Sequence, residues 1–342
     1  MSRVTGRVVG LARVNERGSV RKIPALLAAV GLVASLAACS TAVTSENCSP
    51  RPESGKSSAL IKATGDFASK TAVTFPTPLI AKNLQVTELE AGDGAVLTDG
   101  DFADFQATIW VAETGEYLTG TSFEKTQPSR MDVGVDSDQL GPIMECATVG
   151  SRLAAVSTLG QLFPDVDPAQ AGLDSDTNLV VVIDVTDGFH GKASGADQVP
   201  QTGFPSVVTA PNGTPGVTIP NEPAPTKLES AVLKKGDGPT VKKGDYVTYQ
   251  YEGLVWDSPG SVFASTWTKN LPATSSAADY DPTTKAGLFP GTLDAVVGQA
   301  VGSQVIVIVP ATDSYKAGTA EDGVADGSAR IYVIDILDTQ AP

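Results

Sequence analysis

Short stretches of the chain follow the residue spacing of β-strands. In residues 246–251, bulky Val and Tyr side chains fall at every second position, which predicts a strand with one buried face. Residues 179–185, 305–309 and 331–337 are nearly unbroken apolar runs, and most of their residues are β-branched. Because β-branched side chains favour extended backbone, we expect central strands at these three places.

One stretch has the spacing of a short helix instead. Residues 292–297 follow Pro290-Gly291 and precede Gly298, and their apolar side chains recur at helical intervals. Many short strands together with a short helix predict an antiparallel α+β fold.

The chain contains two copies of one sequence pattern. Residues 84–106 align with residues 228–250 without a gap, at a constant offset of 144. Two later blocks repeat at offsets of 152 and 151, and they are 149–151 with 301–303 and 182–187 with 333–338. A repeat that runs from the start to the end of each copy predicts two domains of one fold.

The repeat divides the chain into five parts. The two copies occupy residues 79–188 and 227–342, and the Pro- and Gly-rich residues 189–226 between them are expected to form an extended linker. Residues 39–78 are expected to be a flexible tether, and residues 1–38 a signal peptide.

The beginning of the chain has the pattern of an export signal. Six Lys and Arg residues precede an uncharged apolar run, residues 23–38, for which a buried core helix is the alternative. The run ends in Leu36-Ala37-Ala38-Cys39, which resembles a bacterial lipobox, in which the cysteine is lipid-modified and becomes the new N-terminus. We therefore expect lipidation of Cys39 and a chain anchored in the cell membrane through its acyl chains alone, facing the extracytoplasmic side.

Charge and composition exclude several functions. The formal net charge is −15 and the isoelectric point is near 4.4, so the chain lacks the positive surface that nucleic acids require. The one histidine, His190, lies in a glycine-rich stretch where a solvated side chain is expected, which leaves no Ser-His-Asp triad and no histidine-rich metal site. We expect no cofactor and no metal ion, and we expect a monomer.

Two further cysteines, Cys48 and Cys146, remain if Cys39 carries lipid. In an oxidising compartment a disulfide between them would join the tether to the first domain, and two separate thiols are the alternative. The spacing of the three cysteines fits no zinc site.

Five blocks of the second copy occur in a characteristic order, and they are residues 244–253 (GDYVTYQYEG), 262–267 (VFASTW), 288–302 (LFPG and VGQAVG), 309–315 (VP and Tyr315) and 331–337 (IYVIDIL). These blocks resemble the motifs of the FKBP-type peptidyl-prolyl cis-trans isomerases. The resemblance implies two FKBP-like domains, each a twisted antiparallel β-sheet curled around one short helix.

The resemblance also implies an isomerase that assists the folding of secreted or envelope proteins. Its substrates would be proline-containing polypeptides outside the cytoplasm. The proline pocket would be formed by Tyr251, Phe263, Leu288, Phe289, Tyr315 and Tyr332. The Tyr315 hydroxyl and the Phe289 backbone N–H would donate hydrogen bonds to the peptide carbonyls. Plain core packing is the alternative role for each aromatic ring.

Three positions of the second copy depart from the family pattern. Thr292 stands in place of the tryptophan of the pocket floor, Ala264 in place of an acid and Ala273 in place of a wall aromatic. The missing indole leaves either a deeper hole or a void that Trp256 or Trp267 fills. A catalytically inactive chaperone or protein-binding lipoprotein of the same fold is therefore the alternative function, and a solute-binding or structural envelope lipoprotein is a third.

The first copy departs further. Ala107 stands where the second copy has Tyr251, and residues 140–145 lack the Pro-Gly-Trp element of the family. We expect the first copy to be an FKBP-like domain without catalytic activity.

Overall fold

The computed structural model describes most of the chain after residue 47. The described residues are 48–49, 52–124, 128–134, 137, 139–258, 260–315, 323–325 and 327–342. The expected signal peptide and Cys39 lie outside these ranges. No helix within them is long and apolar enough to cross a membrane.

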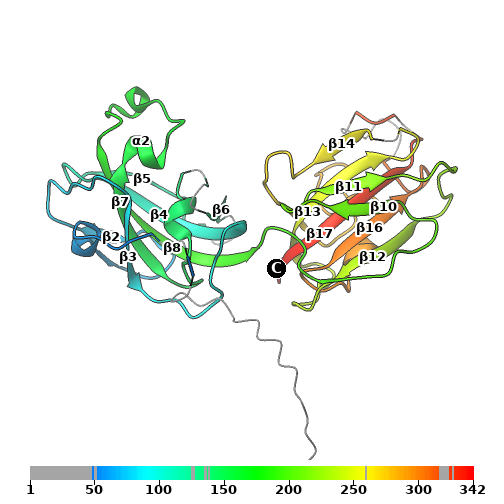
Figure 1. The fold of residues 1–342 in the computed structure, drawn as a ribbon, viewed down its shortest axis with the longest axis horizontal. Coiled ribbons are helices and arrows are strands. Elements are labelled where there is room, and N and C mark those ends of the chain that lie inside the picture. Colours follow the sequence, from blue (N-terminus) through cyan, green and yellow to red (C-terminus); the bar gives the residue numbers. More distant parts are fainter. Residues whose placement is uncertain are drawn as a thin grey trace, which may run out of the picture. The chain divides into compact units, whose positions relative to one another are not determined.

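The first half of the chain folds into a six-stranded antiparallel sheet (Figure 1). Its strands are β3 (Gln85–Glu90), β4 (Asp101–Val111), β5 (Tyr117–Gly120), β6 (Ser129–Asp132), β7 (Arg152–Thr158) and β8 (Asn178–His190). They lie in the order β3-β7-β8-β4-β5, and β6 also pairs with β4. The helices of this half are α1 (Gly141–Met144), α2 (Leu159–Leu162) and the 3-10 helix η2 (Pro168–Ala171).

The second half folds into a seven-stranded antiparallel sheet. Its strands are β9 (Ala196–Asp197), β12 (Glu229–Lys235), β13 (Tyr246–Val255), β14 (Val262–Ser265), β15 (Ala273–Ser276), β16 (Gln304–Val309) and β17 (Arg330–Gln340). They lie in the order β14-β13-β17-β16-β12-β9, and β15 also pairs with β13. The helix α3 (Leu293–Val296) occupies the place predicted for a helix at residues 292–297.

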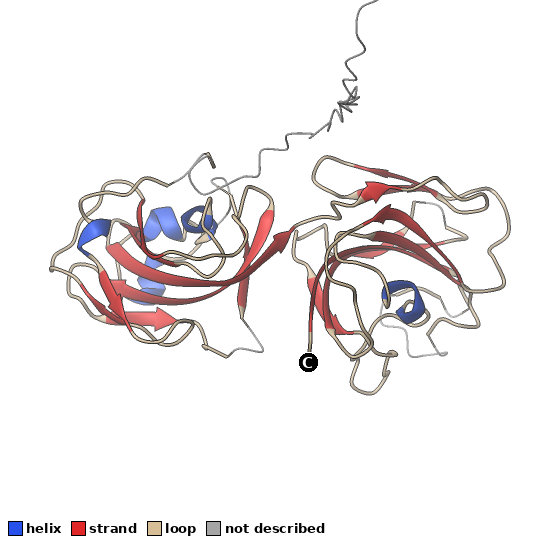
Figure 2. Ribbon diagram, turned by 90° about the horizontal axis from the view of Figure 1, so that it is seen from below, coloured by secondary structure: helices blue, strands red, loops and turns tan. Residues whose placement is uncertain are grey.

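The two sheets have the same strand order. When β3 to β8 are matched in sequence order with β12 to β17, each neighbouring pair of strands in the first sheet has its counterpart in the second. The helices α1 and α3 lie between equivalent strands, and each sheet curls around its short helices (Figure 2). The predicted α+β fold with two domains of one topology is confirmed.

Strand β13 is buried on both faces, so the predicted single buried face is wrong. Val247 and Tyr249 lie in the core around α3, as the alternation predicts. On the opposite face, Thr248 and Gln250 are only 3% and 0% exposed. Thr248 is hydrogen-bonded to Thr274 at 2.9 Å, and the Gln250 amide donates to Asn270 at 3.4 Å. The Thr248 hydroxyl is thus satisfied by a neighbouring side chain, whereas the buried Gln250 Oε1 has no hydrogen-bond partner among the described residues.

The outer face of the first sheet is covered by the chain that precedes it. This segment contains the 3-10 helix η1 (Ser58–Leu60) and the paired strands β1 (Lys62–Thr64) and β2 (Ala72–Thr74). Ala63, Val73 and Phe75 pack on a buried cluster that includes Val180 and Val182 of β8. Residues 52–78 are therefore folded against the domain, and the expected flexible tether does not extend into them.

The outer face of the second sheet is covered in the same way. The strands β10 (Ser206–Thr209) and β11 (Pro215–Thr218) form a hairpin that lies over the sheet in Figure 1. Val207, Val217 and Ile219 pack on a buried cluster that includes Ile306 and Ile331. The predicted linker is therefore largely a folded part of the second domain.

The two covering segments are copies of each other. The positions that pack on the sheet are separated by 144 residues, the offset that also relates the two sheets: Ala63 corresponds to Val207, Val73 to Val217 and Phe75 to Ile219. In each half a buried aspartate of the last strand also accepts a backbone N–H from outside the sheet: Asp184 from Ala68 of the β1–β2 turn at 2.7 Å, and Asp335 from Ala193, which precedes β9, at 2.8 Å. The repeated unit is thus longer than the sequence repeat indicates.

A disulfide joins Cys48 to Cys146. Cys48 lies before η1, and Cys146 directly follows α1 and is fully buried. The bond therefore connects the beginning of the described chain to the helical side of the first sheet.

Candidate functional site

Three of the residues predicted for the pocket come from neighbouring strands. Tyr251 lies in β13, Phe263 in β14 and Tyr332 in β17. Gly253 of β13 is paired with Tyr332, and a Cβ atom at this glycine would lie 2.5 Å from the Phe263 ring. The absence of a side chain at Gly253 therefore lets the Phe263 ring lie against the strand.

The other three predicted residues come from loops. Leu288 and Phe289 precede α3, and Tyr315 follows β16. Gly291 has φ +78°, a left-handed conformation that glycine adopts readily and that turns the chain into α3. Leu288 is only 1% exposed and packs in the core of the second sheet.

Phe289 is the centre of a packed group of aromatic rings. Its ring is stacked on Tyr332, with 4.7 Å between the centroids and 7° between the planes. Its centroid is 4.6 Å from that of Tyr251, and Phe263 meets Tyr332 edge-on at 5.8 Å. The structure thus brings four of the six predicted residues together, and we call these four rings the aromatic cluster.

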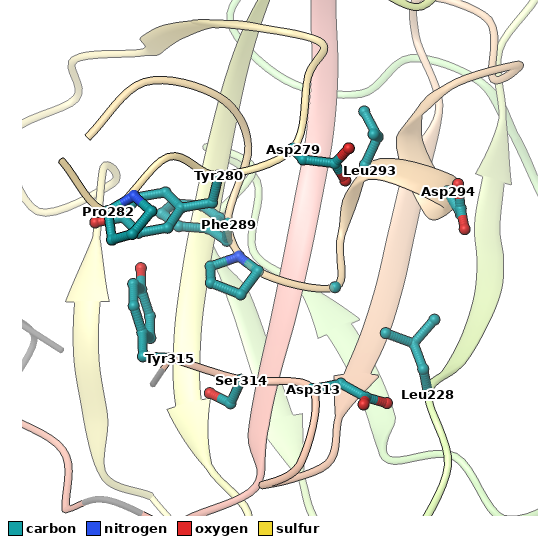
Figure 3. A pocket seen from close by; sticks show the side chains of 12 residues that line it. Leu228, Asp279, Tyr280, Pro282, Phe289, Leu293, Asp294, Asp313, Ser314 and Tyr315 are labelled. Atoms are coloured by element: carbon teal, nitrogen blue, oxygen red, sulfur yellow. The ribbon is translucent and has the colours of Figure 1, made fainter. Parts of the chain in front are cut away.

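An open cavity of about 470 Å³ lies beside the aromatic cluster (Figure 3). Phe289 and Tyr315 are the two predicted residues that line it. The lining residues that the sequence analysis missed are Leu228, Asp279, Tyr280, Pro282, Pro290, Gly291, Leu293, Asp294, Asp313 and Ser314. The other four predicted residues do not line this cavity, and they are Tyr251, Phe263, Leu288 and Tyr332. The Phe289 ring belongs both to the aromatic cluster, through its stacking on Tyr332, and to the cavity wall.

Thr292, which stands in place of the expected floor tryptophan, lies inside the domain. It is fully buried, and its hydroxyl donates to the Phe289 carbonyl at 2.8 Å. The two tryptophans considered as replacements lie elsewhere: Trp256 packs on the outer face of the sheet, and Trp267 lies against Gly213 of the β10–β11 turn. The aromatic ring in this region is that of Phe289, so the expectation for Trp256 and Trp267 is wrong.

Tyr280 supplies an aromatic wall that the sequence did not reveal. Its ring meets that of Tyr315 edge-on, with 5.2 Å between the centroids. Ala273, where an aromatic was expected, lies in β15 opposite Tyr249. No periodic pattern marks Tyr280, because it lies in the loop between β15 and α3 and reaches the cavity only through the path of that loop.

Arg330 connects Tyr315 to the sheet. This side chain, at the start of β17, is only 2% exposed. Its guanidinium carbon lies 5.1 Å from the centroid of the Tyr315 ring and 6.0 Å from that of Phe263. Its Nη1 donates to the Ser314 hydroxyl at 2.6 Å and to the Ser328 carbonyl at 3.3 Å. These contacts hold the loop that carries Tyr315.

Apart from the Arg330 guanidinium, the charged side chains of the site lie at the cavity. Burial raises the pKa of Tyr249 to about 12, so this phenol stays neutral next to the aromatic cluster. Its hydroxyl is hydrogen-bonded to Ser275 at 3.2 Å. The carboxylates of Asp279, Asp294 and Asp313 line the cavity and are exposed.

The equivalent face of the first half is filled by its own chain. Ala107, at the position of Tyr251, is 3% exposed and packs in the core. The helix α2 follows β7 where the Tyr315 loop follows β16, and its Leu159 and Leu162 are buried in the same core as Ile143. Aliphatic side chains therefore occupy the side of this sheet on which the second half has its cavity.

Comparison with known proteins identifies the second half. The family model of FKBP-type peptidyl-prolyl cis-trans isomerases matches residues 238–337. No curated protein sequence matches the chain.

Solved structures similar to the chain include FkpA from Escherichia coli, at 20% identity and a TM-score of 0.29, over 41% of this chain and 53% of that one. The three FKBP domains of wheat FKBP73 match at 16% identity and a TM-score of 0.31, over 76% of this chain and 96% of that one. The chain thus covers about half the length of FkpA. Residues 238–337, the part of the chain that the model of the FKBP-type peptidyl-prolyl cis-trans isomerase family matches, carry most of the cavity wall.

Proposed function

We propose that the second half of the chain isomerises peptide bonds that precede proline. The observation that carries this proposal is the cavity beside the aromatic cluster, which lies mostly within the residues that the family model matches. Tyr280, Phe289 and Tyr315 form one end of this cavity, and their rings offer an apolar surface to a proline ring.

The reaction needs no nucleophile. Rotation about an Xaa-Pro amide passes through a twisted state without resonance, over a barrier of about 18–20 kcal/mol. A twisted amide carries a less polar carbonyl, so an apolar cavity that excludes water favours it over the planar forms. The Tyr315 hydroxyl and the Phe289 backbone N–H are our candidates for donors to the peptide carbonyls.

The test measures isomerisation of an Ala-Leu-Pro-Phe peptide by exchange NMR with the purified full chain. We expect a clear acceleration that Phe289→Ala lowers about tenfold, since a ring contact contributes about 0.5–1.5 kcal/mol beyond its buried area. Tyr315→Phe should lower the rate while leaving peptide affinity nearly unchanged. Tyr246→Phe is the control, because Tyr246 is 50% exposed and does not line the cavity. An uncatalysed rate with folded protein would overturn the proposal.

A binding protein without catalysis is the second candidate. The observation that favours it is the stacking of Phe289 on Tyr332, which fills the space behind the cavity, together with Thr292, Ala264 and Ala273 at altered positions. This candidate predicts that the chain binds unfolded polypeptides equally well after every proline is replaced. Suppressed aggregation of a proline-free client, without isomerisation of the peptide, would select it.

We further propose that the chain is a lipoprotein that acts, as a monomer, on extracytoplasmic polypeptides. Support comes from the basic and apolar residues that precede Cys39 and from the disulfide between Cys48 and Cys146, a bond typical of oxidising compartments. Labelling of cells with a fatty acid should mark the chain, and Cys39→Ser should abolish the label. Label that persists in this variant would exclude Cys39 as the modified residue.

A further inference from the structure

The cavity of the second half has two chemically different ends. Figure 3 shows Tyr280, Phe289 and Tyr315 at one end, with Pro282 beside them. At the other end lie Asp279, Asp294 and Asp313. The carboxylates alone would define no site, but they share one continuous cavity with the rings that we propose to hold proline.

The acidic end comes from three separate parts of the chain. Asp279 lies in the loop after β15, Asp294 in the first turn of α3, and Asp313 in the loop after β16. None of the residues that line the cavity is Lys or Arg, so no positive charge within the lining compensates these three carboxylates.

One ammonium group already lies near this end. The Nζ atom of Lys243, from outside the lining, is 3.9 Å from a carboxylate oxygen of Asp279. Both side chains are largely exposed, at 69% and 85%, so this pair is weak. Asp294 and Asp313 have no such ion pair among the described residues, and they are the carboxylates available to a bound peptide.

We propose that this cavity selects proline segments in which a residue next to the proline is Lys or Arg. The inference rests on the proposed isomerase function and names its substrate class. Consecutive Cα atoms are about 3.8 Å apart, so a residue adjacent to a proline at the aromatic end extends along the same cavity. A cavity of about 470 Å³ has room for more than one side chain.

The expected preference is modest because the carboxylates are exposed. Exposed ion pairs contribute about 0.2–1 kcal/mol each, so two of them correspond to about a two- to thirtyfold preference for Lys over Leu at low salt. Added salt screens such pairs, and the preference should approach unity near 1 M salt.

The experiment compares peptides with Lys, Leu or Glu on either side of the proline. Isomerisation is measured by exchange NMR and affinity by NMR titration, with the full chain. We expect the order Lys, Leu, Glu in both measurements. Asp294→Asn with Asp313→Asn should abolish the difference between the Lys and Glu peptides, and the Leu peptide measured with the same variant is the reference for this ratio. The matched control is Asp237→Asn with Asp257→Asn, which removes two exposed charges outside the cavity lining.

The outcomes separate this inference from the proposed function. An accelerated Leu peptide with equal rates and affinities for Lys and Glu peptides overturns the substrate class and leaves the isomerase standing. A preference that survives the double variant of Asp294 and Asp313 also overturns it. If the chain accelerates the isomerisation of no peptide, the proposed isomerase function is wrong. The order of the peptide affinities then still decides whether the cavity selects basic segments.

Discussion

The two halves of the chain share one topology but differ on the concave side of the sheet. In the first half, Leu159 and Leu162 of α2 are buried in the core, and Ala107 lies where the second half has Tyr251. In the second half, the corresponding loop carries Tyr315 at the edge of a cavity. The same sheet therefore forms with or without a cavity, because the segments between its strands determine what occupies this side.

A second difference lies at the buried aspartate of the last strand. In the first half, Asp184 receives two hydrogen bonds from Arg152, at 2.6 and 2.9 Å. In the second half, the equivalent Asp335 receives one from the Gln304 amide, at 2.7 Å. At the same place in the sheet, the first copy therefore has an ion pair, whereas in the second copy the aspartate accepts its side-chain hydrogen bond from a neutral amide.

The largest expected effect comes from removing Asp184. Asp184→Ala leaves Arg152, whose side chain is 1% exposed, without its main partner, and breaking a buried ion pair costs about 3–5 kcal/mol. Asp335→Ala leaves only neutral donors, which costs about 1–3 kcal/mol. Hydrogen exchange of β8 and β17, read by mass spectrometry, measures each loss in its own domain.

Arg152→Gln is the matched variant for this comparison, since it gives the first half the Gln-Asp pair of the second. It should cost less than Asp184→Ala, because the Gln amide can donate to the remaining Asp184 carboxylate as Gln304 donates to Asp335, whereas Asp184→Ala leaves the Arg152 charge without that partner. Equal losses of protection in Asp184→Ala and Asp335→Ala would show that the difference between the two pairs has no energetic consequence.

The next effect is a pH dependence due to Asp335 of the second half. Burial raises the pKa of Asp335 to about 6, above the value of about 3.9 for an exposed aspartate. The folded state therefore binds the Asp335 proton more tightly than the unfolded state does. Protonation of Asp335 contributes fully to the free energy of unfolding below about pH 3.9, and this contribution is lost as the pH rises through about 6. Relative to Asp335→Asn, the free energy of unfolding of the parent protein should fall by up to about 1.4 kcal/mol per pH unit between pH 4 and 6.

Urea unfolding of both proteins at pH 4, 5, 6 and 7 measures that difference. A difference between parent and variant that stays constant over this range would mean that Asp335 does not titrate in it. Other carboxylates titrate equally in both proteins, so the difference between the parent and Asp335→Asn in free energy of unfolding reports on Asp335 alone.

A smaller effect is expected for Arg330, which only the second half places beside a cavity residue. Arg330→Met removes the bond to Ser314 and the contact with the Tyr315 ring, and cation–π contacts of this kind contribute about 0.5–2 kcal/mol. Because Arg330 positions Tyr315 and does not line the cavity, kcat of the proposed isomerase should fall several-fold with little change in KM. Arg330→Lys should restore part of the rate, whereas parallel losses in Met and Lys variants with unchanged melting temperature would exclude a positioning role.

Much of the fold could be predicted because its pattern is local. The apolar runs at residues 305–309 and 331–337 predict β16 and β17, and the spacing after Pro290-Gly291 predicts α3. The covering segments were missed because residues 61–75 and 205–219 share only burial positions and few identical residues. A tether and a linker were therefore expected at the two segments that cover the outer faces of the sheets.

The duplication, the positions of the central strands along the chain and the resemblance of the second half to a known family could be predicted from the sequence, since repeats, strand periodicity and motif order are properties of neighbouring residues. Which side chains face the cavity followed only from the three-dimensional fold. Phe289 meets Tyr332, and Tyr280 meets Tyr315, through packing between residues far apart in the chain. Such contacts depend on the paths of loops, and loop paths follow from the packing of the whole domain and not from any local pattern.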